Sequence, residues 1–105
     1  MANRSRTEIA GQILEAVYDH SEDGIGVTQT RIGYTVYLNN GSLKEYLSSL
    51  TIHGLVCYDL AMRRYHITEK GMQILELYNH IEDMIKYGHK KNDNNNSLIG
   101  TAKKE

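Results

Sequence analysis

Basic side chains at four positions in the middle of the chain are the residues best suited to chemistry. They are Arg31, Lys44, Arg63 and Arg64. Lysine and arginine neutralise phosphate groups, and arginine can also donate two parallel hydrogen bonds to a phosphate or to the edge of a base. The plain alternative is that each is an ordinary solvated surface charge. The elements that position these side chains decide between the two interpretations.

A second group of reactive side chains, His53, Cys57 and His66, does not match a known metal or catalytic pattern. The spacing fits no zinc motif, and a structural zinc site usually needs four ligands. Cys57 lacks triad-like partners and is expected to be a small buried hydrophobe. Gly24 and Gly26 lack the further glycine and the preceding strand of a phosphate-binding loop. We therefore expect no metal, no cofactor and no enzymatic activity.

The composition is that of one globular domain. The chain has 105 residues, of which 40% are apolar and 24% are charged. No apolar run reaches the ~20 residues of a membrane span, and no hydrophobic stretch follows the N-terminus, so neither a membrane segment nor a secretory signal is predicted. The single cysteine excludes an internal disulfide framework and is compatible with a reducing compartment. A cytoplasmic protein is expected.

The net charge of −1 at pH 7 gives no general argument for binding nucleic acid. The charges are unevenly placed, however. Four acidic residues gather at the end of the first predicted helix and in the loop after it: Glu15, Asp19, Glu22 and Asp23. The four basic residues lie in other segments. Because local potential steers a phosphate backbone, the position of each charge matters more than the total.

Two helices are predicted in the first third of the chain. Apolar residues at helical spacing define the first, over residues 7–18, and Ser5 and Glu8 have capping-box spacing before it. A loop with two glycines follows. Thr28 can then cap a short second helix over residues 29–36.

A tight turn rich in asparagine and glycine separates the second helix from a third, over about residues 40–52. Asn39 or Ser42 could cap this third helix. Its apolar residues share one face and leave a slim polar face outward. Gly54 suits the left-handed position that ends a helix.

Two short strands and a long helix complete the predicted order. Residues 55–58 and 65–68 are rich in β-branched and aromatic types and form a hairpin. The last helix runs over residues 69–87. Residues 88–105 are rich in asparagine and charge and are expected to form a disordered polar tail.

This order predicts an α+β, mostly helical fold: a winged helix-turn-helix of three helices and a two-stranded wing, with a long C-terminal helix for dimerisation. The winged domain covers residues 5–68. In such a fold the second helix of the motif enters the major groove of DNA, and the hairpin reaches the flanking backbone. The recognition helix would span about residues 40–52 and the wing residues 56–68.

The sequence resembles archaeal winged-helix proteins over roughly residues 5–87. The segments that carry the likeness are Thr28-Gln29-Thr30-Arg31-Ile32, Leu43-Lys44-Glu45-Tyr46-Leu47, His53-Gly54-Leu55-Val56 and Tyr65-His66-Ile67-Thr68-Glu69-Lys70-Gly71. The group includes small dimeric DNA-binding proteins of Sulfolobus and many predicted archaeal transcriptional regulators. The resemblance implies a DNA-binding domain whose last helix pairs with a second subunit as an antiparallel coiled coil.

Eight side chains are predicted to contact double-stranded DNA. Arg63 and Arg64 would contact phosphate or reach into the minor groove from the wing, and Gln29 and Arg31 would contact phosphate from the second helix. The third helix would present the rest to base edges: Asn40, Lys44, Glu45 and Ser48. Asparagine suits adenine, and a glutamate can accept a hydrogen bond from cytosine.

An apolar stripe on the last helix is the predicted dimer interface. Its residues are Ile74, Leu77, Tyr78, Ile81, Met84 and Ile85. Their spacing of three and four residues is that of a coiled-coil seam, although ordinary core packing gives the same pattern. The helix is long for so small a body, so its second half would be exposed in a monomer.

The sequence therefore favours a cytoplasmic, nucleoid-associated transcriptional regulator that binds DNA as a homodimer. Two alternatives stay open. One is an architectural chromatin protein with little sequence preference, and the other is a winged helix used for protein contacts.

Overall fold

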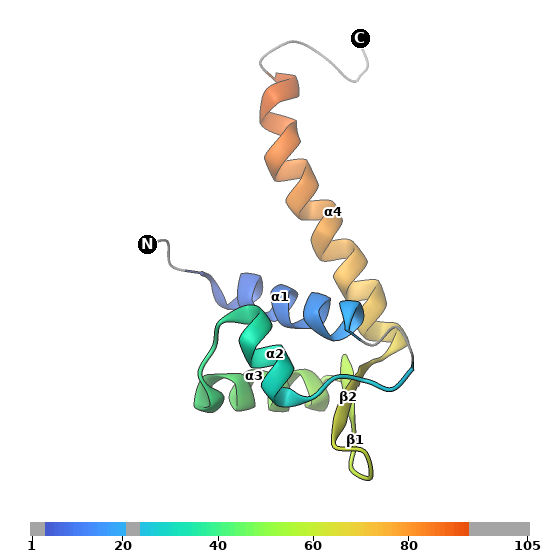
Figure 1. The fold of residues 1–105 in the computed structure, drawn as a ribbon. Coiled ribbons are helices and arrows are strands. Elements are labelled where there is room, and N and C mark those ends of the chain that lie inside the picture. The colour runs from blue at the N-terminus through green and yellow to red at the C-terminus, as the bar shows by residue number, and fades with distance from the viewer. Residues whose placement is uncertain (1–3, 21–23, 93–105) are drawn as a thin grey trace. The chain divides into compact units, whose positions relative to one another are not determined.

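The structure, a computed structural model, describes residues 4–20 and 24–92, with side chains described up to residue 86. Figure 1 shows how its elements follow one another. In chain order these are α1 (Arg6–Asp19), α2 (Gln29–Val36), α3 (Asn40–Ile52), β1 (Val56–Asp59), β2 (Arg64–Ile67) and α4 (Glu69–Asn92). The chain divides into two compact units, Met1–Leu75 and Glu76–Glu105. The predicted order of helices and strands is confirmed.

Polar side chains fix where the first three helices begin. Ser5 Oγ, Thr28 Oγ1 and Asn39 Oδ1 each accept a hydrogen bond from the backbone N–H three residues later, at 3.0, 3.2 and 2.9 Å. Each bond satisfies an N–H group that has no acceptor within its helix. The predicted caps are confirmed, and Asn39 rather than Ser42 caps α3.

The core of the first unit is formed by aliphatic side chains from the three helices, the wing and the start of α4. The buried hydrophobic residues are Ile13, Leu14, Ala16, Val17, Val27, Ile32, Val36, Leu43, Leu47, Leu50, Val56 and Leu75. The α3 members recur every three or four residues, which is why one side of that helix is buried and the other is free. Burial of each large aliphatic side chain stabilises the fold by about 1.5–3 kcal/mol.

Arg4 closes the C-terminal end of α2. Its Nη1 donates to the Val36 carbonyl and to Gln12 Oε1, both at 2.7 Å, and its Nη2 donates to the Tyr37 carbonyl at 3.3 Å. Tyr37 itself has a left-handed backbone, with φ +57°. The last carbonyls of a helix lack partners and carry partial negative charge, so a guanidinium there is favourable. This basic residue therefore has a structural role.

Replacing Arg4 by alanine is expected to lower the free energy of unfolding by about 1–3 kcal/mol, because three hydrogen bonds from a charged donor are lost. Urea unfolding followed by circular dichroism measures the loss. Arg6→Ala is the matched control, since Arg6 is exposed and its guanidinium lies over the Tyr46 ring, 5.4 Å from the ring centroid, without capping a helix. Equal stability of the two variants would contradict the capping role.

The wing is an antiparallel hairpin in which Val56 pairs with Ile67 and Asp59 with Arg64. Each strand is shifted by one residue toward the tip of the hairpin relative to the predicted ranges, 55–58 and 65–68. Strand β1 ends at Asp59, and β2 begins at Arg64. Val27 adds a bridge to Tyr65, with hydrogen bonds of 3.0 and 2.7 Å, so the segment before α2 is tied to the wing.

The junction between the wing and α4 is tightly packed. Thr68 Oγ1 accepts a hydrogen bond from the Gly71 N–H at 2.9 Å and donates to the carbonyls of Gly54 and Leu55 at 2.6 and 3.0 Å. Gly71 is buried, and a Cβ on it would overlap the Leu55 carbonyl oxygen. Gly54 has φ +77°, as predicted for the residue after α3. Helix α4 can approach the Leu55 backbone only because Gly71 has no side chain.

Helix α4 continues to Asn92, past the end predicted at residue 87. Part of the predicted tail, residues 88–92, is therefore helical, because a glycine at 88 weakens a helix without ending it. The remainder of that tail, residues 93–105, lies outside the described residues. Within the described part of the chain, no helix is long and apolar enough to cross a membrane.

Candidate nucleic-acid interface

The outward face of α3 carries the side chains that the sequence placed there. Asn40, Lys44, Glu45 and Ser48 are exposed, while Leu43, Leu47 and Leu50 are buried on the opposite side. The two faces differ because leucines at positions i, i+4 and i+7 turn the remaining positions to solvent. The exposed face is narrow, polar and free of large apolar groups until Ile52 at its end. Such a face fits the width of a major groove.

A hydrogen bond joins the first residues of α2 and α3. Gln29 Nε2 donates to Asn40 Oδ1 at 3.2 Å. A bidentate contact with adenine uses both the oxygen and the nitrogen of an asparagine amide. With Asn40 Oδ1 already accepting a hydrogen bond from Gln29, one of the two lone pairs of that oxygen is occupied. The structure thus brings two of the predicted contact residues together and changes what one of them can offer.

The two arginines of the wing occupy different positions. Arg63 is exposed and left-handed, with φ +57°, in a tip where Asp59 Oδ1 accepts from the N–H groups of Ala61 and Met62 at 3.0 and 3.2 Å. Arg64 is half-buried, and its Nη1 donates to the Gly26 carbonyl at 3.4 Å. Of the two, only Arg63 is exposed. Arg64 instead faces the loop before α2.

One of two neighbouring tyrosines in the wing has a raised pKa. Tyr58 and Tyr65 lie side by side with ring centroids 4.7 Å apart. Burial, together with the neighbouring Tyr58, raises the pKa of Tyr65 above its ordinary value of 10.0. Because a phenol is neutral below its pKa, the Tyr65 ring adds no negative charge beside the basic wing at neutral pH.

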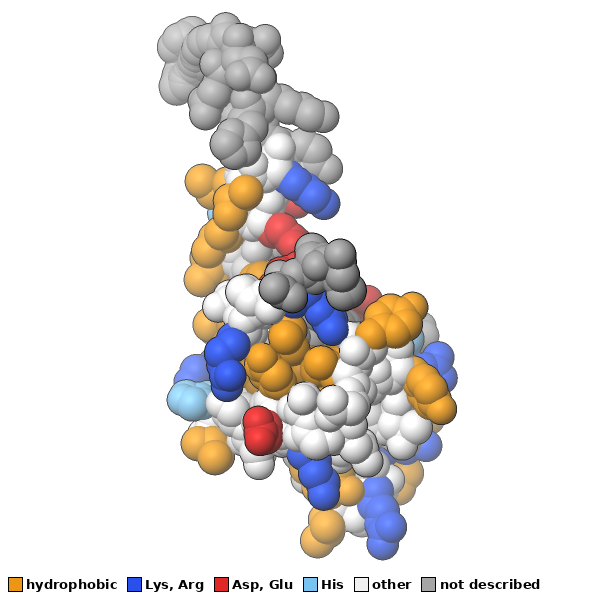
Figure 2. Space-filling view, turned by 90° about the vertical axis from the view of Figure 1, so that its left-hand side faces the viewer, with side chains coloured by type: hydrophobic (Ala, Val, Ile, Leu, Met, Phe, Trp, Pro, Cys, Tyr) orange, Lys and Arg blue, Asp and Glu red, His pale blue; other side chains and the backbone are white. Residues whose placement is uncertain are grey.

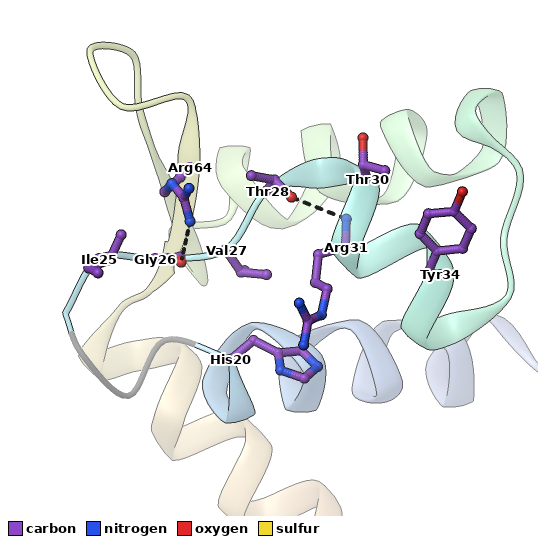
Figure 3. A pocket seen from close by; sticks show the side chains of 9 residues that line it. All are labelled: His20, Ile25, Gly26, Val27, Thr28, Thr30, Arg31, Tyr34 and Arg64. Carbon is purple, nitrogen blue, oxygen red and sulfur yellow. Dashed lines mark hydrogen bonds between the residues drawn. The ribbon is translucent and has the colours of Figure 1, made fainter.

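Arg31 lies in a hollow of about 490 Å³ rather than on the α3 face (Figure 3). The lining residues are His20, Ile25, Gly26, Val27, Thr28, Thr30, Arg31, Tyr34 and Arg64. The hollow thus joins Arg31 and Arg64 from distant parts of the sequence. Sequence reasoning missed the contributions of His20 and Tyr34. Only the packing of α1 beside α2 brings His20 to Arg31, whereas Tyr34 lies three residues after Arg31 on α2 itself.

Cys57 is exposed, so the expectation that it is buried was wrong. Its neighbour Val56 is buried, and alternate residues of a strand face opposite sides. His53 Nδ1 lies 2.8 Å from the Ser49 carbonyl at the end of α3. Among the residues that the structure describes, no three His, Cys, Asp or Glu side chains gather where they could hold a metal ion.

The apolar stripe predicted on α4 is largely solvent-exposed. In the first unit Ile74 is 39% exposed. In the second unit Leu77, Ile81, Met84 and Ile85 are 47–63% exposed. Tyr78 is half-buried, and its hydroxyl donates to Glu82 Oε2 at 3.4 Å. Figure 2 shows hydrophobic side chains following one side of this helical segment.

Three solved structures with a similar fold are of MepR from S. aureus. A point mutant of that protein has a TM-score of 0.65 and 22% identity, covering 76% of this chain and 61% of that one. The selenomethionine form of another mutant, from a multidrug-resistant clinical isolate, has a TM-score of 0.62 and 21% identity, with coverages of 76% and 60%. The form bound to ethidium bromide has a TM-score of 0.60 and 22% identity, with coverages of 82% and 62%.

This chain spans about three fifths of those MepR chains. A search of curated proteins finds no match. A family model described as winged helix-turn-helix matches residues 3–86, most of the chain. That match agrees with the three helices, the two-stranded wing and the C-terminal helix seen here. The chain belongs to the winged helix-turn-helix family.

Proposed function

We propose that this protein is a transcriptional regulator that binds double-stranded DNA as a homodimer. The observation that carries the proposal is the two-sided character of α3. Its leucines are buried, and its other face presents Asn40, Lys44, Glu45 and Ser48 to solvent. Side chains of this kind hydrogen-bond to base edges in the major groove.

The wing supports this proposal through Arg63. Its guanidinium projects from an ordered hairpin tip into solvent, where it can reach a phosphate or the minor groove. Gln29, Arg31 and Arg64 are proposed to contact the backbone nearer to α2. Lys44 would then read a base or a phosphate from the middle of α3. Together these contacts place positive charge on both sides of a groove-binding helix.

Dimer formation is proposed through the stripe on α4, in the manner of the small archaeal winged-helix proteins that the sequence resembles. A two-fold dimer presents two copies of α3 to two half-sites of an operator. No effector domain is needed for such an arrangement to repress or activate by occupancy. The second unit supplies the exposed apolar surface that the arrangement requires.

Replacing Arg63 and Arg64 together by alanine is expected to weaken binding to all DNA sequences by roughly tenfold to a hundredfold at physiological salt, because up to two phosphate contacts are lost. The slope of log K against log salt should fall by about 1–2. Fluorescence anisotropy with a labelled duplex across a salt titration measures both. The matched control replaces Arg6 and Lys86, two exposed cations on other elements.

Unchanged affinity and salt slope in the Arg63/Arg64 variant would contradict the role of the wing. The formal net charge of −1 is compatible with one competing function, a winged helix that contacts proteins. Genome-wide binding of the tagged protein separates the candidates. A few sharp sites support a regulator, broad coverage indicates an architectural protein, and no sites indicate protein contacts.

A further inference from the structure

We propose that the hollow between the end of α1, the start of α2 and the wing binds a small organic anion. The expected ligand class is an oxyanion, a phosphate ester or a carboxylate, attached to a compact apolar group. The binding itself does not depend on the proposed DNA function. Its consequence for regulation rests on that function.

Two cationic side chains and an imidazole line this hollow, and no carboxylate of the described residues does. Figure 3 shows the Arg31 side chain extending from α2 toward the His20 ring. Within the described part of the chain, the Arg31 guanidinium forms no hydrogen bond or ion pair. The bonds of Arg31 are made by its backbone, whose N–H donates to Thr28 Oγ1 and whose carbonyl accepts from Thr35 Oγ1. A guanidinium that has no anionic partner among the described residues, placed beside an imidazole, is a favourable place for an oxyanion.

The groups around Arg31 are held in place by their own hydrogen bonds. Thr35 Oγ1 donates to the Arg31 carbonyl at 2.9 Å and lies 3.3 Å from His20 Nε2. Because the hydroxyl proton is used on the carbonyl, Thr35 accepts from His20 Nε2–H, which fixes the imidazole. Arg64 is anchored on the Gly26 carbonyl. An anion would therefore meet a site that is largely formed in advance.

The remaining wall is apolar and of suitable size. Ile25, Val27 and the Tyr34 ring line the same hollow as the cations. A volume of about 490 Å³ lies within the range of small-molecule sites, roughly 300–1,000 Å³, and exceeds what a bare phosphate fills. This combination indicates a ligand with one anionic end and one apolar end.

A second hollow beside α1 shows why this one is distinctive. It is lined by Arg4, Gln12, Glu15 and Asp19, among others, and has a volume of about 300 Å³. Its arginine is already bonded to Gln12 and to the end of α2, and two carboxylates line it. The second hollow therefore offers no free positive charge to an anion.

Ligand occupancy would affect DNA binding because Arg31 and Arg64 belong to both surfaces. A bound anion neutralises the charge that a DNA phosphate would otherwise meet near α2. We therefore expect the ligand to lower the affinity for DNA, which would make the regulator responsive to a metabolite without a separate effector domain.

Titration of the full chain with phenyl phosphate, inorganic phosphate and the neutral analogue phenol tests the site. Two-dimensional NMR at constant ionic strength follows the amide signals of Gly26, Thr28 and Arg31 and the ring signals of His20. Saturable shifts are expected, with phenyl phosphate binding at least about threefold more tightly than phosphate and phenol binding more weakly than both. Arg31→Gln should weaken phenyl phosphate binding at least about tenfold, whereas Arg6→Gln should change it less than twofold.

Linear shifts that match those caused by sodium chloride, or equal binding by Arg31→Gln and the wild type, would overturn the proposal. The proposal would also be overturned if the His20 and Arg31 signals shifted with duplex DNA but not with phenyl phosphate or inorganic phosphate. The hollow would then be a contact site for the DNA backbone only. A competition experiment, in which DNA affinity is measured with and without saturating phenyl phosphate, separates anion binding in the hollow from its effect on DNA binding. Saturable phenyl phosphate binding without any DNA binding would support the site and refute the proposed function, and DNA affinity unchanged by saturating ligand would refute the regulatory consequence.

Discussion

Replacing Gly71 by alanine is expected to lower the free energy of unfolding by about 3 kcal/mol, the upper part of the range for overpacked sites. The added Cβ would overlap the Leu55 carbonyl oxygen and lie close to the Ile67 side chain. A backbone carbonyl that also accepts hydrogen bonds from Thr68 cannot move aside without loss of those bonds. Alanine in an exposed helix would instead stabilise it by about 1 kcal/mol, so the sign of the effect tests the packing.

Gly41→Ala is the matched control, because Gly41 also lies in the first turn of a helix. A Cβ there would meet only Asn39 Oδ1, at an ordinary 3.5 Å. Stability equal to the wild type or slightly above it is expected. Urea unfolding at one fixed protein concentration measures both variants, since the proposed dimerisation would make apparent stability depend on concentration. A Gly71→Ala protein as stable as the wild type would refute the close approach of α4 to Leu55.

The elements could be predicted because their signals are local. Ser5, Thr28 and Asn39 precede apolar residues at helical spacing, and each caps the helix predicted for it. Gly54 occupies the left-handed position expected after α3. The end of α4 was less predictable, because a single glycine and a loss of apolar periodicity weaken a helix without forbidding it.

The candidate site was predicted less completely because it depends on contacts between distant segments. The exposed face of α3 follows from the spacing of its leucines. The difference between the exposed Arg63 and the half-buried Arg64 could not be predicted in the same way, since it depends on the Gly26 carbonyl lying beside β2. The meeting of Arg31 with His20 likewise arises from the packing of α1 against α2. The exposure of Cys57, by contrast, could have been read from strand alternation beside a buried Val56.

The stripe on α4 carries the other large expected effect. In the second unit, Leu77, Ile81 and Met84 recur at spacings of four and three, and each is about half exposed or more. Each such side chain gains about 1 kcal/mol or more when a second helix covers it. Glu82 and Asp83 lie between them, and Glu76 and Lys86 lie at either end of the segment. The pattern is that of a seam with polar flanks.

Ile81→Asp is expected to convert the dimer into monomers at micromolar concentration, with a dissociation constant raised at least about a hundredfold, because a carboxylate at the seam must be buried without a partner. Sedimentation velocity should give two 12.0 kDa chains for the wild type and one for the variant. His80→Asp is the matched control, since it adds the same charge at the neighbouring, exposed position. It should remain dimeric.

The same variant links assembly to DNA binding. Two tethered domains bind two half-sites with a high effective concentration, so Ile81→Asp should also weaken binding to a two-half-site operator by about a hundredfold while leaving a single half-site nearly unaffected. A wild-type monomer at micromolar concentration would refute the interface outright. A dimeric Ile81→Asp protein would instead show that the interface does not include this stripe. The exposed Leu77, Ile81 and Met84 would then need a different partner. Equal losses on one and two half-sites would show that the substitution disturbs the domain itself rather than the pairing of its copies.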